Sequence, residues 1–105
     1  MELEPHFLRR EDDQHFRIVE RLEEADGLEF LCPKCFATNS GPVGTHMVIC
    51  WRPAVPQTTK PIPGRWDLIG TGLEDLSLIA GSSSIQLTDG CRWHGFVTNG
   101  EVTGA

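Results

Sequence analysis

Two short motifs contain the residues whose types and spacing suit metal binding. Two residues separate Cys32 from Cys35, and two separate Cys91 from His94. A tight turn lets two ligands at this spacing contact one cation, and two such turns complete a tetrahedral set of thiolate and imidazole donors, which suits Zn²⁺. The sequence therefore predicts a structural zinc site formed by Cys32, Cys35, Cys91 and His94.

His46 and Cys50 are further candidate ligands. They lie four residues apart in the apolar segment 45–51, so they share one face if this segment is a strand. A free cysteine often acts as a small buried hydrophobe, and a lone histidine is often a polar residue at a strand edge. Either residue remains an alternative to one of the four ligands named above.

The cysteines also allow two interpretations without a metal. Residues 1–4 lack the basic start and apolar run of a signal peptide, so we expect a cytoplasmic protein, in which metal binding is favoured over disulfides. A Cys-Pro-x-Cys motif is also typical of redox centres whose second cysteine lies in a helix. Residues 37–44 are rich in turn-forming residues and predict that no helix follows Cys35, which disfavours the redox interpretation.

A site with four protein ligands is structural, because it leaves no coordination position for a water molecule. The alternative is a hydrolase-like zinc enzyme with an open metal position, which needs a nearby carboxylate such as Asp67 or Asp89. Zinc-dependent deaminases need a His-x-Glu unit before their cysteine pair, and neither His6 nor His15 begins one. The serines at 82–84 are interpreted as a polar turn. We therefore assign no catalytic residue, and an enzyme is the less favoured class.

Short strands and turns must position the candidate ligands. The 105 residues include 11 glycines and 7 prolines, which predicts a mainly β, small α+β fold of short antiparallel hairpins, similar to a zinc ribbon. Asn99-Gly100 is a strong hairpin signal between residues 96–98 and 101–103, and residues 52–64 form a proline-rich surface loop. The other predicted strands are 15–20, 28–31, 45–51, 65–70, 76–80 and 85–88, with a helical turn at 21–25.

Charge and hydropathy divide the chain and limit its partners. Residues 1–14 mix charges with few apolar residues and predict a flexible acidic arm, followed by a single zinc-binding domain at 15–105. Nine basic residues against fifteen acidic ones give a net charge of −6, which disfavours nucleic-acid binding. No apolar stretch approaches the roughly 20 residues of a membrane span, so no membrane contact is expected.

The C-terminal part of the chain resembles a family of small phage and prophage proteins of unknown function. The likeness covers roughly residues 27–103, and its most specific elements are Cys91-x-x-His94-Gly-Phe and the Gly-Ser-Ser-Ser-Ile segment. The resemblance implies a β-rich metal-binding domain in the cytoplasm of a phage host. Some members carry the label ammonia monooxygenase, but this sequence lacks a copper-binding histidine set and a membrane span. We expect the protein to act by binding another protein, either a host factor or a phage protein.

Overall fold

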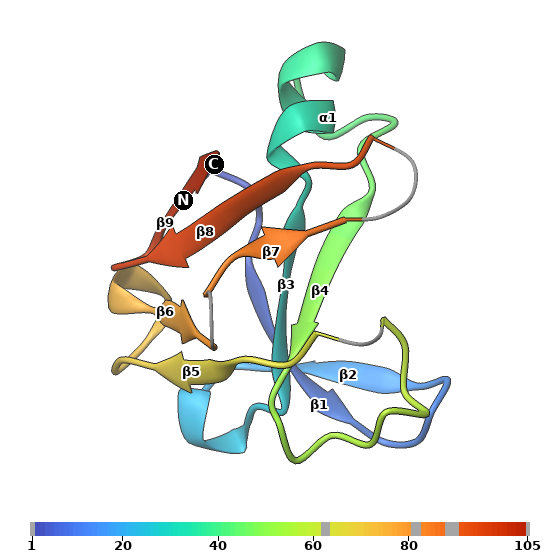
Figure 1. Cartoon of the computed structure of the whole chain (residues 1–105), viewed down its shortest axis with the longest axis vertical. Helices are drawn as coiled ribbons and strands as arrows, with labels where there is room; N and C mark the ends of the chain where they lie inside the picture. The colour runs from blue at the N-terminus through green and yellow to red at the C-terminus, as the bar shows by residue number, and fades with distance from the viewer. Residues whose placement is uncertain (1, 62–63, 81–82, 88–90, 105) are drawn as a thin grey trace.

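Three antiparallel sheets form the architecture of the computed structural model, which describes residues 2–61, 64–80, 83–87 and 91–104 (Figure 1). The first sheet has the order β2-β1-β3-β4, the second pairs β5 with β6, and the third has the order β7-β8-β9. The mainly β prediction is confirmed. The strands are β1 (His6–Arg10), β2 (Phe16–Val19), β3 (Gly27–Leu31), β4 (Met47–Trp51), β5 (Asp67–Ile69), β6 (Ser77–Ile79), β7 (Ile85–Gln86), β8 (His94–Thr98) and β9 (Glu101–Gly104).

The N-terminal segment contains an interior strand of the first sheet. β1 pairs with both β2 and β3, and the side chains of Phe7 and Leu8 are only 2% and 0% exposed. The expectation of a flexible arm was wrong for residues 6–10. Adjacent side chains point to opposite faces of a strand, and here both faces are covered, so Phe7 and Leu8 are both buried and no alternating pattern is visible in the sequence.

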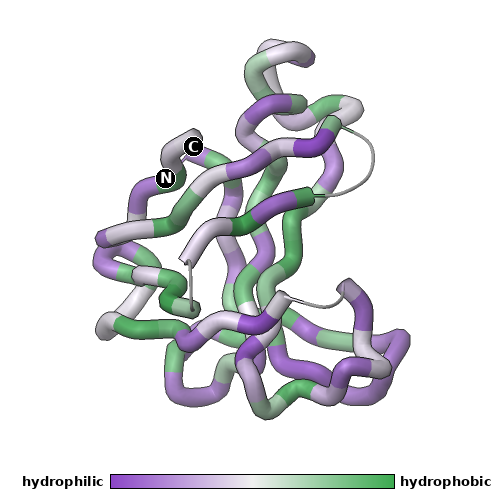
Figure 2. The backbone as a smooth tube through the Cα atoms, in the orientation of Figure 1, coloured by the Kyte–Doolittle hydropathy of each residue, from purple (hydrophilic) through white to green (hydrophobic). Residues whose placement is uncertain are grey.

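The first sheet has a hydrophobic cluster on each face. On one face, Phe30 and Val48 pack with residues of the other two sheets, including Leu78 and Val97. On the opposite face, Leu8 packs with Trp51 and with Val55 from the following loop. Hydrophobic stretches accordingly follow β3 and β4 through the molecule (Figure 2).

Residues 52–61 form a loop held by side-chain hydrogen bonds. The Arg65 guanidinium donates to the carbonyl oxygens of Val55, Pro56 and Thr59, and partial burial lowers its pKa. The buried hydroxyl of Thr59 accepts a bond from Arg10 Nε at 2.6 Å and donates to Asp13 Oδ1 at 2.7 Å. Thr59 therefore joins this loop to the hairpin formed by β1 and β2.

A short helix, α1 (Pro33–Asn39), directly follows β3, with Cys32 as its N-cap residue and Pro33 in its first turn. Proline suits this position because the first helical amides have no acceptor within the helix. Ser40 adopts a left-handed conformation and the Gly41 amide donates to the Phe36 carbonyl, which ends the helix after seven residues. The prediction that no helix follows Cys35 was therefore wrong.

The predicted C-terminal hairpin is confirmed, with Asn99 and Gly100 at its turn. Both residues have positive φ angles, 50° and 78°, as a two-residue turn of the favoured twist requires. The predicted pairing of 65–70 with 76–80 is also present as β5 and β6, joined through a 3₁₀ turn at Leu73–Asp75. Both chain ends lie beside β9, and α1 projects from one end of the molecule (Figure 1).

Candidate metal centre

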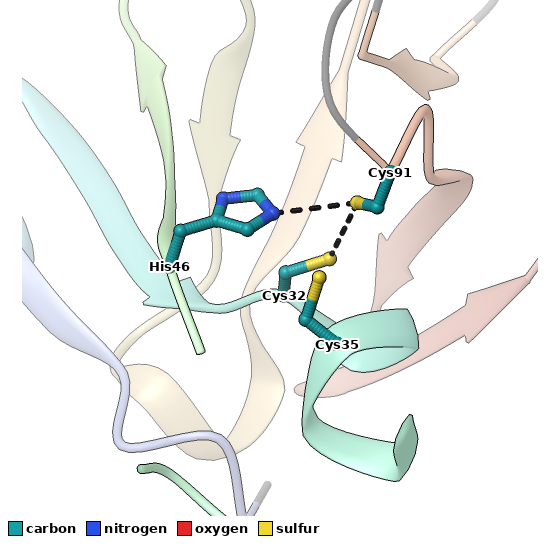
Figure 3. A group of neighbouring side chains, drawn as sticks. All are labelled: Cys32, Cys35, His46 and Cys91. Carbon is teal, nitrogen blue, oxygen red and sulfur yellow. Dashed lines mark hydrogen bonds between the residues drawn. The ribbon is translucent and has the colours of Figure 1, made fainter. Parts of the chain in front are cut away.

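Three cysteines and one histidine converge at the base of α1. One ligand atom each from Cys32, Cys35, His46 and Cys91 lies within 4.8 Å of every other (Figure 3). Cys32 is buried, Cys35 and Cys91 are partly exposed, and His46 is exposed. The group therefore lies at the surface end of the core, where an ion can enter from solvent.

The pairing of β3 with β4 brings Cys32 and His46 together. The antiparallel register that pairs Leu31 with Met47 places Cys32 opposite His46, and the Cys32 amide donates to the His46 carbonyl at 2.9 Å. Directly opposite residues of an antiparallel pair share one face. Both side chains thus extend the face that carries Phe30 and Val48 in the core.

Cys35 joins the group because the chain enters α1 immediately after Cys32. The Phe36 amide donates to the Cys32 carbonyl at 2.9 Å, which is the first hydrogen bond of the helix. This first turn folds Cys35 back, so that its thiol points toward that of Cys32 (Figure 3). The first ligand pair therefore depends on a strand-to-helix junction.

Cys91 comes from the distant segment that precedes β8. Its Sγ lies 3.3 Å from the Cys32 Sγ and 3.3 Å from the His46 Nε2. The Lys34 ammonium donates to the Cys91 carbonyl at 2.8 Å, which ties this segment to α1. Cys91 thus closes the group across 59 residues of sequence.

Contacts and burial within the group shift the pKa values of two of its thiols. The hydrogen bond with His46 lowers the pKa of Cys91 from its ordinary 9.0 to about 6, with a further contribution from Cys32. Desolvation raises the pKa of Cys35 to about 11, and its contacts with Cys91 and Cys32 act in the same direction. In the absence of a metal, Cys91 therefore carries the thiolate at neutral pH.

His94 does not belong to this group, although the sequence analysis assigned it as the fourth ligand. Trp93 is buried and packs edge-on against Phe30, with ring centroids 5.9 Å apart. Because side chains alternate along β8, His94 points away from the core and is exposed, with its ring centroid 6.3 Å from that of Phe96. The structure brings together Cys32, Cys35 and Cys91 as predicted, and adds His46.

The position of His46 follows from strand pairing, which the sequence alone does not define. His46 is an alternative ligand in the sequence, where its four-residue spacing from Cys50 does not link it to Cys32, whereas the two-residue spacing of Cys91 and His94 favours His94. A hairpin formed by segments 28–31 and 45–51 in the observed register would have placed His46 beside Cys32.

The remaining candidates lie elsewhere. Cys50 pairs with Leu28 inside the core, where burial raises its pKa, as expected for a small buried hydrophobe. Asp67 is exposed on β5, and Asp89 lies outside the described residues. The Ser83 hydroxyl donates to the Ala80 carbonyl, consistent with the predicted polar turn, whereas Ser82 is also outside the described residues.

The geometry favours metal binding over a dithiol redox centre. Cys35 lies in α1, so the argument against redox chemistry that rested on the lack of a helix after Cys35 no longer holds. A dithiol centre, however, needs only Cys32 and Cys35, whereas two more soft donors lie within the same 4.8 Å. Three thiols and an imidazole around one point are the ligand set of a Cys₃His zinc site.

Comparisons of the chain with protein-family models, curated proteins and solved structures find no match. Within the ranges that the structure describes, no helix is long and apolar enough to cross a membrane.

Proposed function

We propose that the protein binds one structural Zn²⁺ through Cys32, Cys35, His46 and Cys91. We further propose that the domain, stabilised by this ion, acts by binding another protein. The observation that carries the proposal is the convergence of four donor atoms, within 4.8 Å of one another, from the junction of β3 and α1, from α1, from the residue before β4 and from the segment before β8. Three thiolates and one imidazole fill a tetrahedron and leave no position for a catalytic water.

The surroundings of the site support a fastening role. The ion would connect Cys91 to β3, β4 and α1, and so add to the bond from Lys34 and to the packing of Trp93 on Phe30. Three thiolates around Zn²⁺ leave one negative charge, and the Lys34 ammonium offsets it. In a chain of 105 residues the core is modest, so a metal contributes a large share of the stability.

The surface supports a protein partner. Ile69 and Ile79 lie on neighbouring strands of the β5–β6 hairpin and are 55% and 46% exposed, and Ile18 on β2 is 57% exposed. The net charge of −6 disfavours a nucleic-acid partner. A phage or prophage setting for this partner is part of the proposal only through the resemblance at the motif Cys91-x-x-His94-Gly-Phe.

Metal content and metal removal test the fastening role. Native mass spectrometry and elemental analysis of the purified protein should find one zinc per chain. A chelator should remove it and lower the thermal midpoint of unfolding, and added Zn²⁺ should restore that midpoint. A protein purified without metal, or one whose fold and thermal midpoint are unchanged by the chelator, would refute the fastening role.

The protein-binding role needs a separate test. Proximity labelling in the host cell should enrich a partner with the wild-type protein and lose it with Ile69→Asp and Ile79→Asp, while zinc content and fold are retained. The exposed Glu74→Gln change is the matched control and should keep the partner. Equal labelling by all variants would exclude this surface.

A further inference from the structure

We propose that Cys32 and Cys91 form a disulfide when a hydroperoxide reaches the site, and that this bond replaces the metal as the link between the two ends of the domain. The release of a metal rests on the proposed function, in which these residues bind Zn²⁺. The disulfide itself rests on the position and accessibility of the two sulfur atoms.

The Cys32 and Cys91 sulfurs are well placed for this reaction. Their Sγ atoms lie 3.3 Å apart, so an approach of about 1.3 Å gives the bond length of a disulfide. Cys91 is partly exposed, whereas the Cys32 side chain is 0% exposed. Solvent-borne oxidant can thus reach Cys91, and the buried Cys32 thiol is in contact with it.

The chemistry proceeds in two steps. The Cys91 thiolate attacks one oxygen of the hydroperoxide, the O–O bond breaks, and the alkoxide or hydroxide that leaves takes a proton from solvent. The Cys32 thiolate then attacks the Cys91 sulfenic acid, the S–S bond forms, and the departing hydroxide is protonated to water. Two electrons pass from the two sulfurs to one peroxide.

Loss of two thiolates releases the metal. Cys35 and His46 remain, and two protein ligands do not hold Zn²⁺ as four do. The disulfide joins residues that are 59 apart in sequence, so it closes the same loop as the ion and restricts the unfolded chain. The oxidised, metal-free domain therefore keeps its fold, and the His46 imidazole no longer faces a free Cys91 thiol.

A Cys32–Cys35 disulfide is the competing product, and the sequence allows the two to be distinguished. Trypsin cleaves after Arg21, Lys34, Arg65 and Arg92, but not at the Arg52-Pro53 and Lys60-Pro61 bonds. Cys32, Cys35 and Cys91 therefore fall in separate peptides, 22–34, 35–65 and 66–92.

The zinc-loaded protein should be treated with one equivalent of hydrogen peroxide and its thiols then alkylated. We expect loss of two of the four free thiols, release of one zinc to a chromogenic chelator, and a link between peptides 22–34 and 66–92. Cys50 should remain reduced because it is buried. A link between 22–34 and 35–65, or sulfinic acid without any link, would overturn the proposal.

Two variants and the metal-free protein separate this inference from the zinc assignment. Cys35→Ser should still form the 22–34 to 66–92 link, and Cys91→Ser should not. The same mapping on reduced, metal-free protein tests the pair even if no zinc is found, in which case only the metal assignment fails. Bound zinc that survives peroxide, with all four thiols intact, refutes the disulfide alone.

Discussion

Replacement of His46 by alanine tests the ligand set most directly, and His94→Ala is its matched control. Both histidines are exposed, and each lies at or beside the end of a strand, but the imidazole of His46 alone contacts Cys91, at 3.3 Å. The structure therefore predicts that His46→Ala weakens zinc binding and that His94→Ala does not. The spacing of the sequence motif predicts the reverse.

The size of the effect follows from the number of ligands. Structural zinc sites bind with an apparent free energy of about 10–16 kcal/mol at neutral pH, so one ligand in four accounts for about 2.5–4 kcal/mol. At about 1.4 kcal/mol per tenfold change, this corresponds to a loss of about 10²–10³ in affinity. Because His46 is exposed, water can occupy its coordination position, and we expect the lower end of this range.

Competition with a chromogenic zinc chelator measures the affinity of each variant. His94→Ala should match the wild type within a factor of two to three, and circular dichroism should show that both zinc-loaded variants are folded. Equal affinities for His46→Ala and the wild type, or a larger loss for His94→Ala, would refute the assignment of His46 and the reasoning from strand register.

Three further predictions concern stability and reactivity. Thr59→Val removes a buried hydroxyl, so chemical unfolding should show a loss of about 1–3 kcal/mol, whereas Thr58→Val at an exposed position should change stability by less than about 0.5 kcal/mol. Arg65→Lys retains the charge but loses the planar set of donors, so amide exchange in residues 52–61 should accelerate while the core stays protected. In metal-free protein, alkylation of Cys91 by iodoacetamide should rise with pH around a midpoint near 6, since only the thiolate reacts, and His46→Ala should shift that midpoint upward.

Each of these predictions has a clear contrary result. A loss below about 0.5 kcal/mol in Thr59→Val would show that the contacts of Thr59 with the β1–β2 hairpin do not contribute to stability. Unchanged amide exchange in Arg65→Lys would show that the guanidinium does not hold the loop. An alkylation midpoint near 9 in the wild type would show that His46 does not stabilise the Cys91 thiolate.

The sequence predicts the strands well where local signals are strong. The Asn99-Gly100 turn and the glycine-bounded apolar segments correspond to observed hairpins. It fails at β1, because a short strand buried on both faces has no alternating pattern to set it apart from its charged neighbours. It also fails at α1, where one seven-residue helix starts at a proline and ends among turn formers.

The candidate site was predicted only in part, because spacing in the sequence does not show how the strands pair. The three cysteines share ligand chemistry that composition and spacing reveal. The fourth ligand depends on which face of each strand carries the side chain: Trp93 occupies the core and turns His94 away from it, while the β3–β4 register places His46 on the same face as Cys32. Such non-local pairing is absent from motif spacing.

The pairing of Cys32 with His46 also determines which insertions and deletions the chain can accept. Residues 33–45 only connect the ends of β3 and β4 around α1, so relatives of this protein can differ in length there and still place both ligands side by side, provided that Cys35 keeps its helical turn. One residue added within 27–31 or 47–51 would shift the ladder by one position and turn the imidazole to the opposite face of the sheet. Length variation among homologues should therefore be found in the connection and not in the two strands.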